Sequence, residues 1–214
     1  MTAMVSACTT LSATSSLRHQ GWWAGDNMVC GDLTATLRDE LMELIEQERL
    51  RRAGVGREND FQIDSAVRRD AIFWLSRQRQ VQRRFLDRME ELRLDLNKEL
   101  FLGLFEFEGH FSHYPPGAFY KRHYDSFRGA ANRIVSVVIY LNDNWQAGDG
   151  GELVLYGPDS DAEIIRIEPR AGSMALFLSE EIPHEVLPTQ KDRASISGWF
   201  RLNNSIAGHI DPPR

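Results

Sequence analysis

Apolar residues of the N-terminal half repeat with the spacing of an amphipathic helix in two separate stretches. The first stripe consists of Leu33, Leu37, Leu41, Leu44 and Ile45. It predicts a helix from about Asp32 to Arg52. Asp32 and Thr34 are candidate N-cap residues, and Gly54 is a candidate stop.

The second stretch has the clearer helical pattern. Between residues 78 and 100 the apolar positions recur three or four residues apart, at Val81, Phe85, Met89, Leu92 and Leu96. Arg and Glu fill the other faces. This pattern predicts a helix with one face on a core and a solvated, charged opposite face.

From Phe105 onward the pattern changes to short runs rich in β-branched and aromatic residues, separated by Gly, Pro, Asn and Asp. These runs are FEFEGHFSHY, FYKRHYD, RIVSVVIYLN, GELVLYG, AEIIRIEP, SMALFLS and ASISGWFRL. Strands at this density, with no helical signal between them, predict a sandwich, jelly roll or small barrel. We therefore expect a mainly β protein in which N-terminal helices cover an antiparallel double sheet.

The chain of 214 residues is long enough for one domain with a substantial core. We expect a loose N-terminus over residues 1–20 and a single domain over 21–203. Within the domain, residues 32–100 form the helical support and 105–203 the β core. GWWAGDNMV and DAIFWL add two short strands, and residues 204–214 form a C-terminal tail.

Charge and cysteine content narrow the classes of function. A net charge of -6 argues against nucleic acid or an anionic membrane as partner, since both favour basic surfaces. No apolar run approaches the roughly 20 residues that cross a bilayer, and the first sixteen residues lack a signal-peptide pattern. Cys8 and Cys30 are too few for a disulfide scaffold, which favours the cytoplasm.

His123 and Asp125 stand two residues apart in a predicted strand, so their side chains share a face. Such a pair is either a surface ion pair or two ligands of a metal. A third ligand would come from a distant strand. Among the six histidines, His19 and His209 lie in the terminal segments, and His110 and His113 face opposite sides of one strand. His184, near the start of a late strand, is the best candidate.

A second constellation lies in the last predicted strand. Alternation places Arg193, Ser195, Ser197 and Trp199 on one face. A guanidinium inside a β core needs a carboxylate or phosphate partner. Tyr140 ends an otherwise apolar strand, and its hydroxyl also needs a partner if it is buried. Arginine, tyrosine and serine together would make a receptor for a dicarboxylate.

The His-x-Asp pair, His184 and Arg193 together resemble the iron(II)- and 2-oxoglutarate-dependent oxygenases. Within that superfamily the sequence from Gly21 to Arg201 is similar to the prolyl hydroxylases that act on hypoxia-inducible factor and to their bacterial relatives. The motifs that carry the resemblance are YPPGAFYKRHYD, VIYLNDNW, GGELVLY, FLSEEIPHEVLP and GWFR. The resemblance implies a double-stranded β-helix, or jelly roll.

The resemblance also implies roles for individual residues. His123, Asp125 and His184 would bind iron, and Arg193 and Tyr140 would hold the distal carboxylate of 2-oxoglutarate. Tyr114 would lie near the iron-chelating end of that cosubstrate. The same pocket would be lined by Tyr120 and Ser197. In the segment RRDAIFW, Asp70 would pair with Arg133, and Arg68 would face the substrate.

The implied activity is hydroxylation of a prolyl residue in a protein. It would require iron(II), 2-oxoglutarate and dioxygen, with stimulation by ascorbate. The leading candidate substrate is the switch loop of elongation factor Tu, because the bacterial relatives act there. Two alternatives stay open: the same chemistry on a ribosomal protein or a small molecule, and a non-catalytic jelly roll that senses 2-oxoglutarate.

Overall fold

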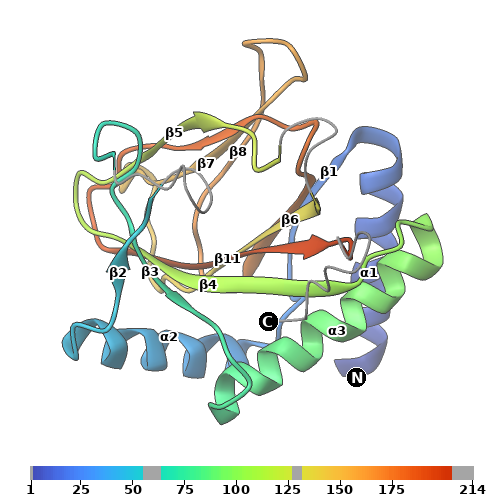
Figure 1. Cartoon of the computed structure of the whole chain (residues 1–214), viewed down its shortest axis with the longest axis horizontal. Coiled ribbons are helices and arrows are strands. Elements are labelled where there is room, and N and C mark those ends of the chain that lie inside the picture. Colours follow the sequence, from blue (N-terminus) through green and yellow to red (C-terminus); the bar gives the residue numbers. More distant parts are fainter. Residues whose placement is uncertain (1, 55–63, 127–131, 204–214) are drawn as a thin grey trace, which may run out of the picture.

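The computed structural model describes residues 2–54, 64–126 and 132–203. Within these ranges the chain forms three helices and two antiparallel β-sheets (Figure 1). The helices are α1 (Thr2–Gln20), α2 (Gly31–Glu46) and α3 (Gln80–Leu100). The predicted fold class, a mainly β protein with flanking helices, is confirmed.

The larger sheet has seven strands in the described residues, in the order β1-β9-β6-β11-β4-β3-β2. Their bounds are β1 Trp22–Asp26, β2 Arg51–Arg52, β3 Ala71–Trp74, β4 Glu106–Tyr114, β6 Arg133–Tyr140, β9 Ser173–Leu178 and β11 Arg193–Arg201. The smaller described sheet has the order β5-β10-β7-β8, with bounds β5 Tyr120–His123, β7 Leu153–Tyr156, β8 Glu163–Ile167 and β10 His184–Val186. The two sheets face each other as the walls of a jelly roll.

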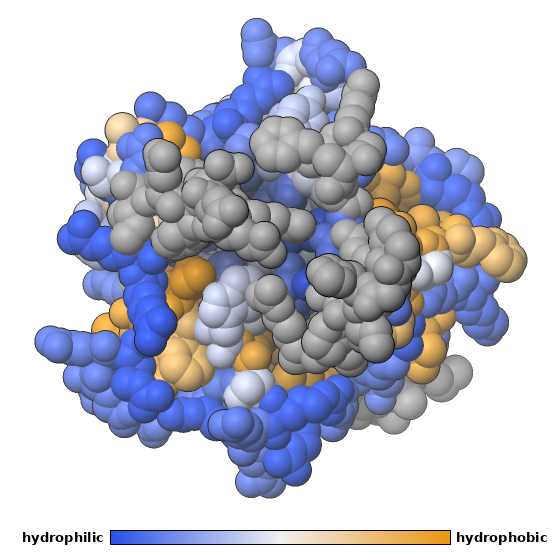
Figure 2. All heavy atoms as spheres, in the orientation of Figure 1, coloured by the Kyte–Doolittle hydropathy of each residue, from blue (hydrophilic) through white to orange (hydrophobic). Residues whose placement is uncertain are grey.

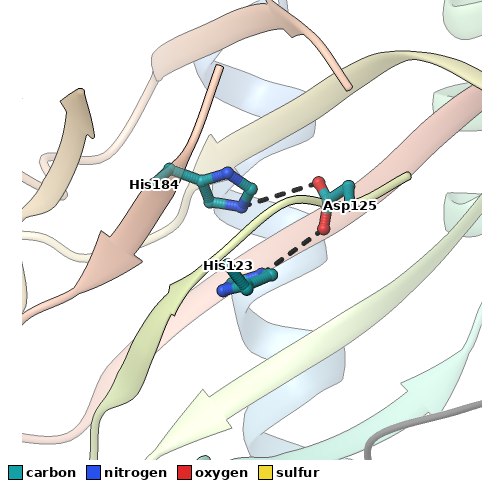
Figure 3. A group of neighbouring side chains, drawn as sticks. All are labelled: His123, Asp125 and His184. Atoms are coloured by element: carbon teal, nitrogen blue, oxygen red, sulfur yellow. Dashed lines mark ion pairs between the residues drawn. The ribbon is translucent and has the colours of Figure 1, made fainter. Parts of the chain in front are cut away.

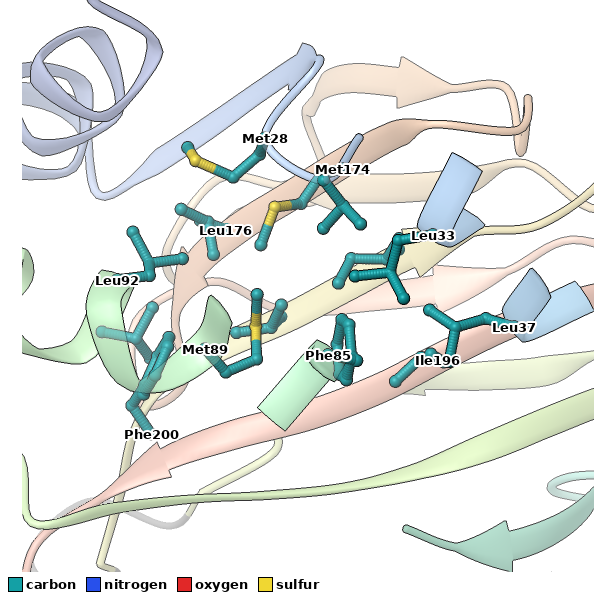
Figure 4. Packing of buried hydrophobic residues seen from close by; sticks show 14 of the residues in the cluster. Met28, Leu33, Leu37, Phe85, Met89, Leu92, Met174, Leu176, Ile196 and Phe200 are labelled. Atoms are coloured by element: carbon teal, nitrogen blue, oxygen red, sulfur yellow. The ribbon is translucent and has the colours of Figure 1, made fainter. Parts of the chain in front are cut away.

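Strand alternation divides the core into two layers. Every second residue of β6 and β11, such as Val135, Ile139 and Ile196, packs toward α2 and α3 on the outer face of the larger sheet. Figure 4 shows Phe85 and Met89 of α3 in the same cluster as Ile196 and Phe200 of β11. The intervening residues point between the sheets. The layer between the sheets is therefore where polar side chains of β6 and β11 gather.

The N-terminus differs from the expectation of a loose segment, because residues 2–20 form α1. Ala13 and Leu17 are almost completely buried in the same core as α3. Arg18 also donates to the backbone carbonyl of Glu99 at the end of α3. The run of Ser, Thr and Ala has no strong apolar period, so tertiary packing accounts for the helix where sequence periodicity predicted none.

The predicted helix over 32–52 is real but shorter. It begins at Gly31 after an N-cap at Cys30, and neither Asp32 nor Thr34 caps it with a side chain. It ends at Glu46 because Glu48 takes a positive φ of 53° and the Arg49 N–H returns to the Leu44 carbonyl. Arg51 and Arg52 instead pair with β3 as an edge strand.

The surface of the molecule is mainly polar in the view of Figure 2, with smaller hydrophobic areas between polar ones. Exposed large apolar side chains include Trp74 on β3 and Phe101 after α3. Among the described helices, none is both long enough and apolar enough to cross a membrane. The predicted tail, with His209, lies outside the described residues.

Candidate metal centre

The backbone brings the two predicted histidine ligands into register across the smaller sheet. His123 is the last residue of β5 and His184 the first of β10, and the two are Cα partners in the antiparallel ladder. Asp125 lies two residues beyond the end of β5, so the strand is shorter than predicted. Its carboxylate nevertheless reaches the two rings.

The three side chains converge on one point (Figure 3). His123 Nε2 lies 3.5 Å from Asp125 Oδ1, and His184 Nε2 lies 3.6 Å from Asp125 Oδ2. One donor atom from each residue falls within 4.8 Å of the other two. The arrangement therefore goes beyond a surface ion pair, since a third ligand from a distant strand completes it.

Hydrogen bonds to neighbouring groups set the orientation of all three side chains. His123 Nδ1 lies 2.7 Å from the Lys121 carbonyl oxygen, and His184 Nδ1 lies 3.2 Å from that of Ile182. A carbonyl only accepts, so each Nδ1 carries the proton and each Nε2 keeps a free lone pair. The Ser136 hydroxyl donates to Asp125 Oδ2 at 2.6 Å. Such partners hold ligands in place before a metal arrives.

Burial and charge keep His184 and Asp125 free of protons at the metal-binding atoms. Burial lowers the pKa of His184 to about 4, although Asp125 acts in the opposite direction. Burial alone would raise the pKa of Asp125, but His184, His123 and the Ser136 hydroxyl hold it well below its usual range. A neutral imidazole and an ionised carboxylate are the forms that bind a metal ion. Two histidines and one carboxylate are the donor set of the non-haem iron(II) oxygenases, so the residues fit that metal.

A second polar site lies deeper between the sheets, at Arg193. This side chain is 1% exposed; its Nε donates to the Gly151 carbonyl at 2.7 Å and its Nη1 to Ser195 Oγ at 3.2 Å. Its Nη2 and the hydroxyl of fully buried Tyr140 have no partner among the described residues. Two unpaired buried donors this close to each other fit an anionic group such as a carboxylate.

Gly151 is required for this site. It has a positive φ of 68°, and a Cβ there would lie 2.9 Å from Arg193 Cδ. A side chain would therefore be both strained and in collision with the arginine stem. This explains the second glycine of the GGELVLY motif.

The remaining predicted pocket residues are Tyr114, Tyr120 and Ser197. Tyr114 is buried, with the Arg193 guanidinium 4.9 Å from its ring centre, and Tyr120 stacks on the His123 ring. Ser197 lies on the inner face of β11, where Ser112 Oγ approaches its hydroxyl at 3.4 Å. Tyr114 and Ser197 are therefore within the layer between the sheets.

The predicted pair of Asp70 and Arg133 is wrong. Arg68 forms two hydrogen bonds with Asp70, of 2.7 and 2.6 Å, while Arg133 binds Glu108 Oε1 at 3.0 Å. Glu108 lies on β4 and also accepts from Arg201 at 2.7 Å. The inner face of the larger sheet thus supplies Arg133 with a nearer carboxylate than Asp70.

Two histidines of β4, His110 and His113, lie outside the group of converging metal ligands in the described residues. His110 and His113 point to opposite faces of β4; His113 pairs with Asp192, and His110 is buried between the sheets. Ser136 was missed as a partner of Asp125. The sequence did contain a hint, because Ser136 is the one hydroxyl residue in the otherwise apolar run RIVSVV. Its partner lies eleven residues away, however, so only the folded structure reveals the contact.

Comparison with known proteins supports the same assignment. Residues 109–201 match the 2OG-Fe(II) oxygenase superfamily model. A prolyl-4-hydroxylase from Pseudomonas putida is 39% identical, with a TM-score of 0.82 over 90% of this chain and 98% of that one. Human Egl nine homolog 1 is 34% identical over 85 residues, 39% of this chain and 20% of the human protein. A Trichoplax adhaerens prolyl hydroxylase, solved with a hypoxia-inducible factor peptide, shares the fold at 23% identity and a TM-score of 0.82.

The fold and the site define a jelly-roll protein with a candidate metal centre of two histidines and one carboxylate, and with a second, buried polar site at Arg193 and Tyr140. The chain belongs to the 2OG-Fe(II) oxygenase superfamily, and its relatives include prolyl hydroxylases. The match spans only a quarter of rat Egl nine homolog 1 and a fifth of the human protein.

Proposed function

We propose that this protein is an iron(II)- and 2-oxoglutarate-dependent dioxygenase that hydroxylates a prolyl residue of a protein substrate. The observation that carries the proposal is the combination of the His123, Asp125 and His184 triad with the unpaired polar atoms of Arg193 and Tyr140. The 39% identity to the Pseudomonas putida prolyl-4-hydroxylase supports the prolyl specificity.

Each part of the site has a task in this proposal. His123, Asp125 and His184 would hold the iron and leave its other positions open to cosubstrates. Bound iron, together with 2-oxoglutarate, would supply the activation of dioxygen needed to hydroxylate an unreactive C–H bond. The protein would contribute fixed ligands and buried surroundings between the sheets that keep water away from the reaction.

Arg193 and Tyr140 would bind the distal carboxylate of 2-oxoglutarate. Arg193 Nη2 would donate one hydrogen bond and the Tyr140 hydroxyl a second. Burial raises the pKa of Tyr140 to about 12, with Arg193 acting in the opposite direction, so the phenol keeps its proton. Tyr114 and Ser197, in the same layer, would contact the part of the cosubstrate nearer the metal.

The substrate is expected to be an exposed, extended loop, because the target carbon must reach the metal between two sheets. Proline suits such loops, since it is frequent in turns and has a fixed φ. A proline in the switch loop of elongation factor Tu is our leading candidate, with ribosomal proteins as the next class to examine. We place the reaction in the cytoplasm, where such substrates are found.

The experiment is a reaction of the purified protein with iron(II), 2-oxoglutarate and elongation factor Tu, followed by peptide mapping. We expect one added oxygen atom on a switch-loop proline and conversion of 2-oxoglutarate to succinate. His123→Ala and His184→Ala should abolish both while retaining the wild-type circular dichroism spectrum. Full turnover in either variant would refute the metal site.

Substrate and chemistry are tested separately in the same reaction. Consumption of 2-oxoglutarate without modification of elongation factor Tu would refute that partner and leave the dioxygenase intact. A screen of the proteome for prolines oxidised by the wild type and not by His123→Ala would then identify the substrate. Binding of 2-oxoglutarate without any turnover would favour the sensing alternative.

A further inference from the structure

Three side chains from separate parts of the site form a continuous stack. The Arg68 guanidinium carbon lies 4.4 Å from the centre of the Tyr120 ring. The Tyr120 ring centre in turn lies 3.6 Å from that of the His123 imidazole, and the two planes differ by 18°. The stack thus connects Arg68, in the segment before β3, with the predicted metal ligand His123.

A β-bulge makes this stack possible. Tyr120 and His123 are three residues apart, so a regular strand would place them on opposite faces. In the ladder between β5 and β10, however, His123 pairs with His184 and Tyr120 with Val186, three residues against two. The extra residue turns both rings to the same side. The stacking is therefore built into the backbone of β5.

The donors of Arg68 are directed into the protein. Nε and Nη2 bind the two carboxylate oxygens of Asp70, and Nη1 donates to the Gly54 carbonyl at 3.2 Å. The side chain of Asp70 is 0% exposed and that of Arg68 is 12% exposed. All three nitrogens of the guanidinium have partners in the chain, and its face is on Tyr120. This environment fixes the plane of the group and argues against a substrate contact.

The backbone clamps the same elements together. Arg68 forms an isolated β-bridge with Tyr120, and the Lys121 N–H donates to the Val67 carbonyl at 2.9 Å. The stack is consequently supported from both ends, by β10 behind His123 and by the segment of residues 64–70 behind Arg68.

We propose that Arg68 is a positioning residue for the metal ligand His123 and acts through the ring of Tyr120; this inference rests on the proposed function only in taking the triad as the metal site. The hydrogen bond from His123 Nδ1 to the Lys121 carbonyl fixes one atom of the ring. This hydrogen bond alone still allows the plane of the imidazole ring to rotate about the bonded atom. The Tyr120 face removes this freedom, and Arg68, held by Asp70, keeps Tyr120 in place.

The test measures metal affinity in the absence of substrate and 2-oxoglutarate. Cobalt(II) is titrated into the metal-free protein, and its visible absorption reports binding and ligand geometry. Tyr120→Leu removes the ring face and should weaken cobalt binding about 10-fold, the lower end of the roughly 10–100-fold range seen when a group supporting a ligand is lost. Arg68→Lys keeps the charge beside buried Asp70 but lacks a planar group to stack, so a smaller loss is expected.

Two variants serve as controls. Tyr120→Phe keeps the stacked ring face, so its cobalt affinity and its visible absorption should equal those of the wild type. Arg69→Met removes the neighbouring arginine, which stacks on Phe119 with its guanidinium carbon 4.9 Å from the ring centre and is exposed. It perturbs the same segment without touching the stack, and cobalt affinity should be unchanged.

The outcomes separate the inference from the proposed function. Wild-type cobalt affinity in both Tyr120→Leu and Arg68→Lys would overturn the positioning role of Arg68. If Arg68→Lys then also raised the KM for the protein substrate, Arg68 would be assigned to substrate binding instead. An equal loss in Arg69→Met would also overturn it, because that indicates general loosening. If the wild type binds cobalt with the expected variant pattern but hydroxylates no protein, the proposed function fails and the positioning role holds.

Discussion

The Arg193 guanidinium lies 5.2 Å from the centre of the Tyr140 ring, and within the described residues each side chain keeps one buried polar atom without a partner. Unpaired donors of this kind are costly unless a ligand binds them. The relationship therefore marks the place where an acidic cosubstrate is expected, at a distance from the metal ligands but within the same layer between the sheets.

Replacing Arg193 should weaken use of 2-oxoglutarate more than any other change in this site. Arg193→Ala loses a charge-assisted hydrogen bond in a buried pocket, so we expect KM for 2-oxoglutarate to rise on the order of 100-fold. Arg193→Lys should recover only part of this, because an ammonium lacks the fork geometry. Succinate production at varied 2-oxoglutarate measures both. An unchanged KM in Arg193→Ala would place the receptor elsewhere.

Ser136→Ala should weaken metal binding without unfolding the protein. The Ser136 hydroxyl donates to Asp125 Oδ2 at 2.6 Å and also lies 2.9 Å from Ser179 Oγ. Loss of a partner that orients a ligand typically costs about 10-fold in metal affinity. Cobalt titration of the metal-free protein measures the effect. Ser173→Ala, whose hydroxyl donates to the Arg170 carbonyl, is the matched control and should bind cobalt as the wild type does.

Glu108 should contribute to stability through two arginines. It accepts from Arg133 and Arg201 on the inner face of the larger sheet and is 6% exposed. Burial opposes its ionisation, yet the two guanidinium groups hold its pKa below the usual range. Glu108→Ala leaves two cations without this partner, so the free energy of unfolding in urea should fall by about 3–5 kcal/mol. A stability equal to that of the wild type would show that Arg133 and Arg201 find other partners.

His110 should make stability depend on pH. Burial lowers its pKa to about 4, from an ordinary value near 6.5. Between these values the unfolded chain binds a proton that the folded protein does not, so stability is present above pH 6.5 and is lost as pH falls toward 4. The shift corresponds to about 3 kcal/mol.

His110→Met tests this directly, because methionine fills the same space without titrating. Urea unfolding of the wild type and the variant at pH 7 and pH 5 gives the two pH slopes. The variant should lose less stability between pH 7 and pH 5 than the wild type does. Identical slopes would mean that His110 binds its proton equally well in both states.

The sequence by itself predicted a helix over about residues 78–100, the strands after Phe105 and the His123, Asp125 and His184 set that the structure brings together. Each of these depends on short-range patterns: an apolar stripe, alternation along a strand, or a motif of adjacent residues. The inward position of Arg193 followed from alternation in the same way, because Ile196 and Phe200 on the other face needed a core.

Only the tertiary structure decided which side chains meet across the chain. Arg133 pairs with Glu108 and not with Asp70, because β4 and β6 both flank β11. Tyr120 faces His123 only because a bulge in β5 offsets the ladder with β10. The helix over residues 2–20 forms against α3 and β1, although its small polar residues carry little intrinsic signal. Pairings between distant strands depend on register and packing, which no local pattern encodes.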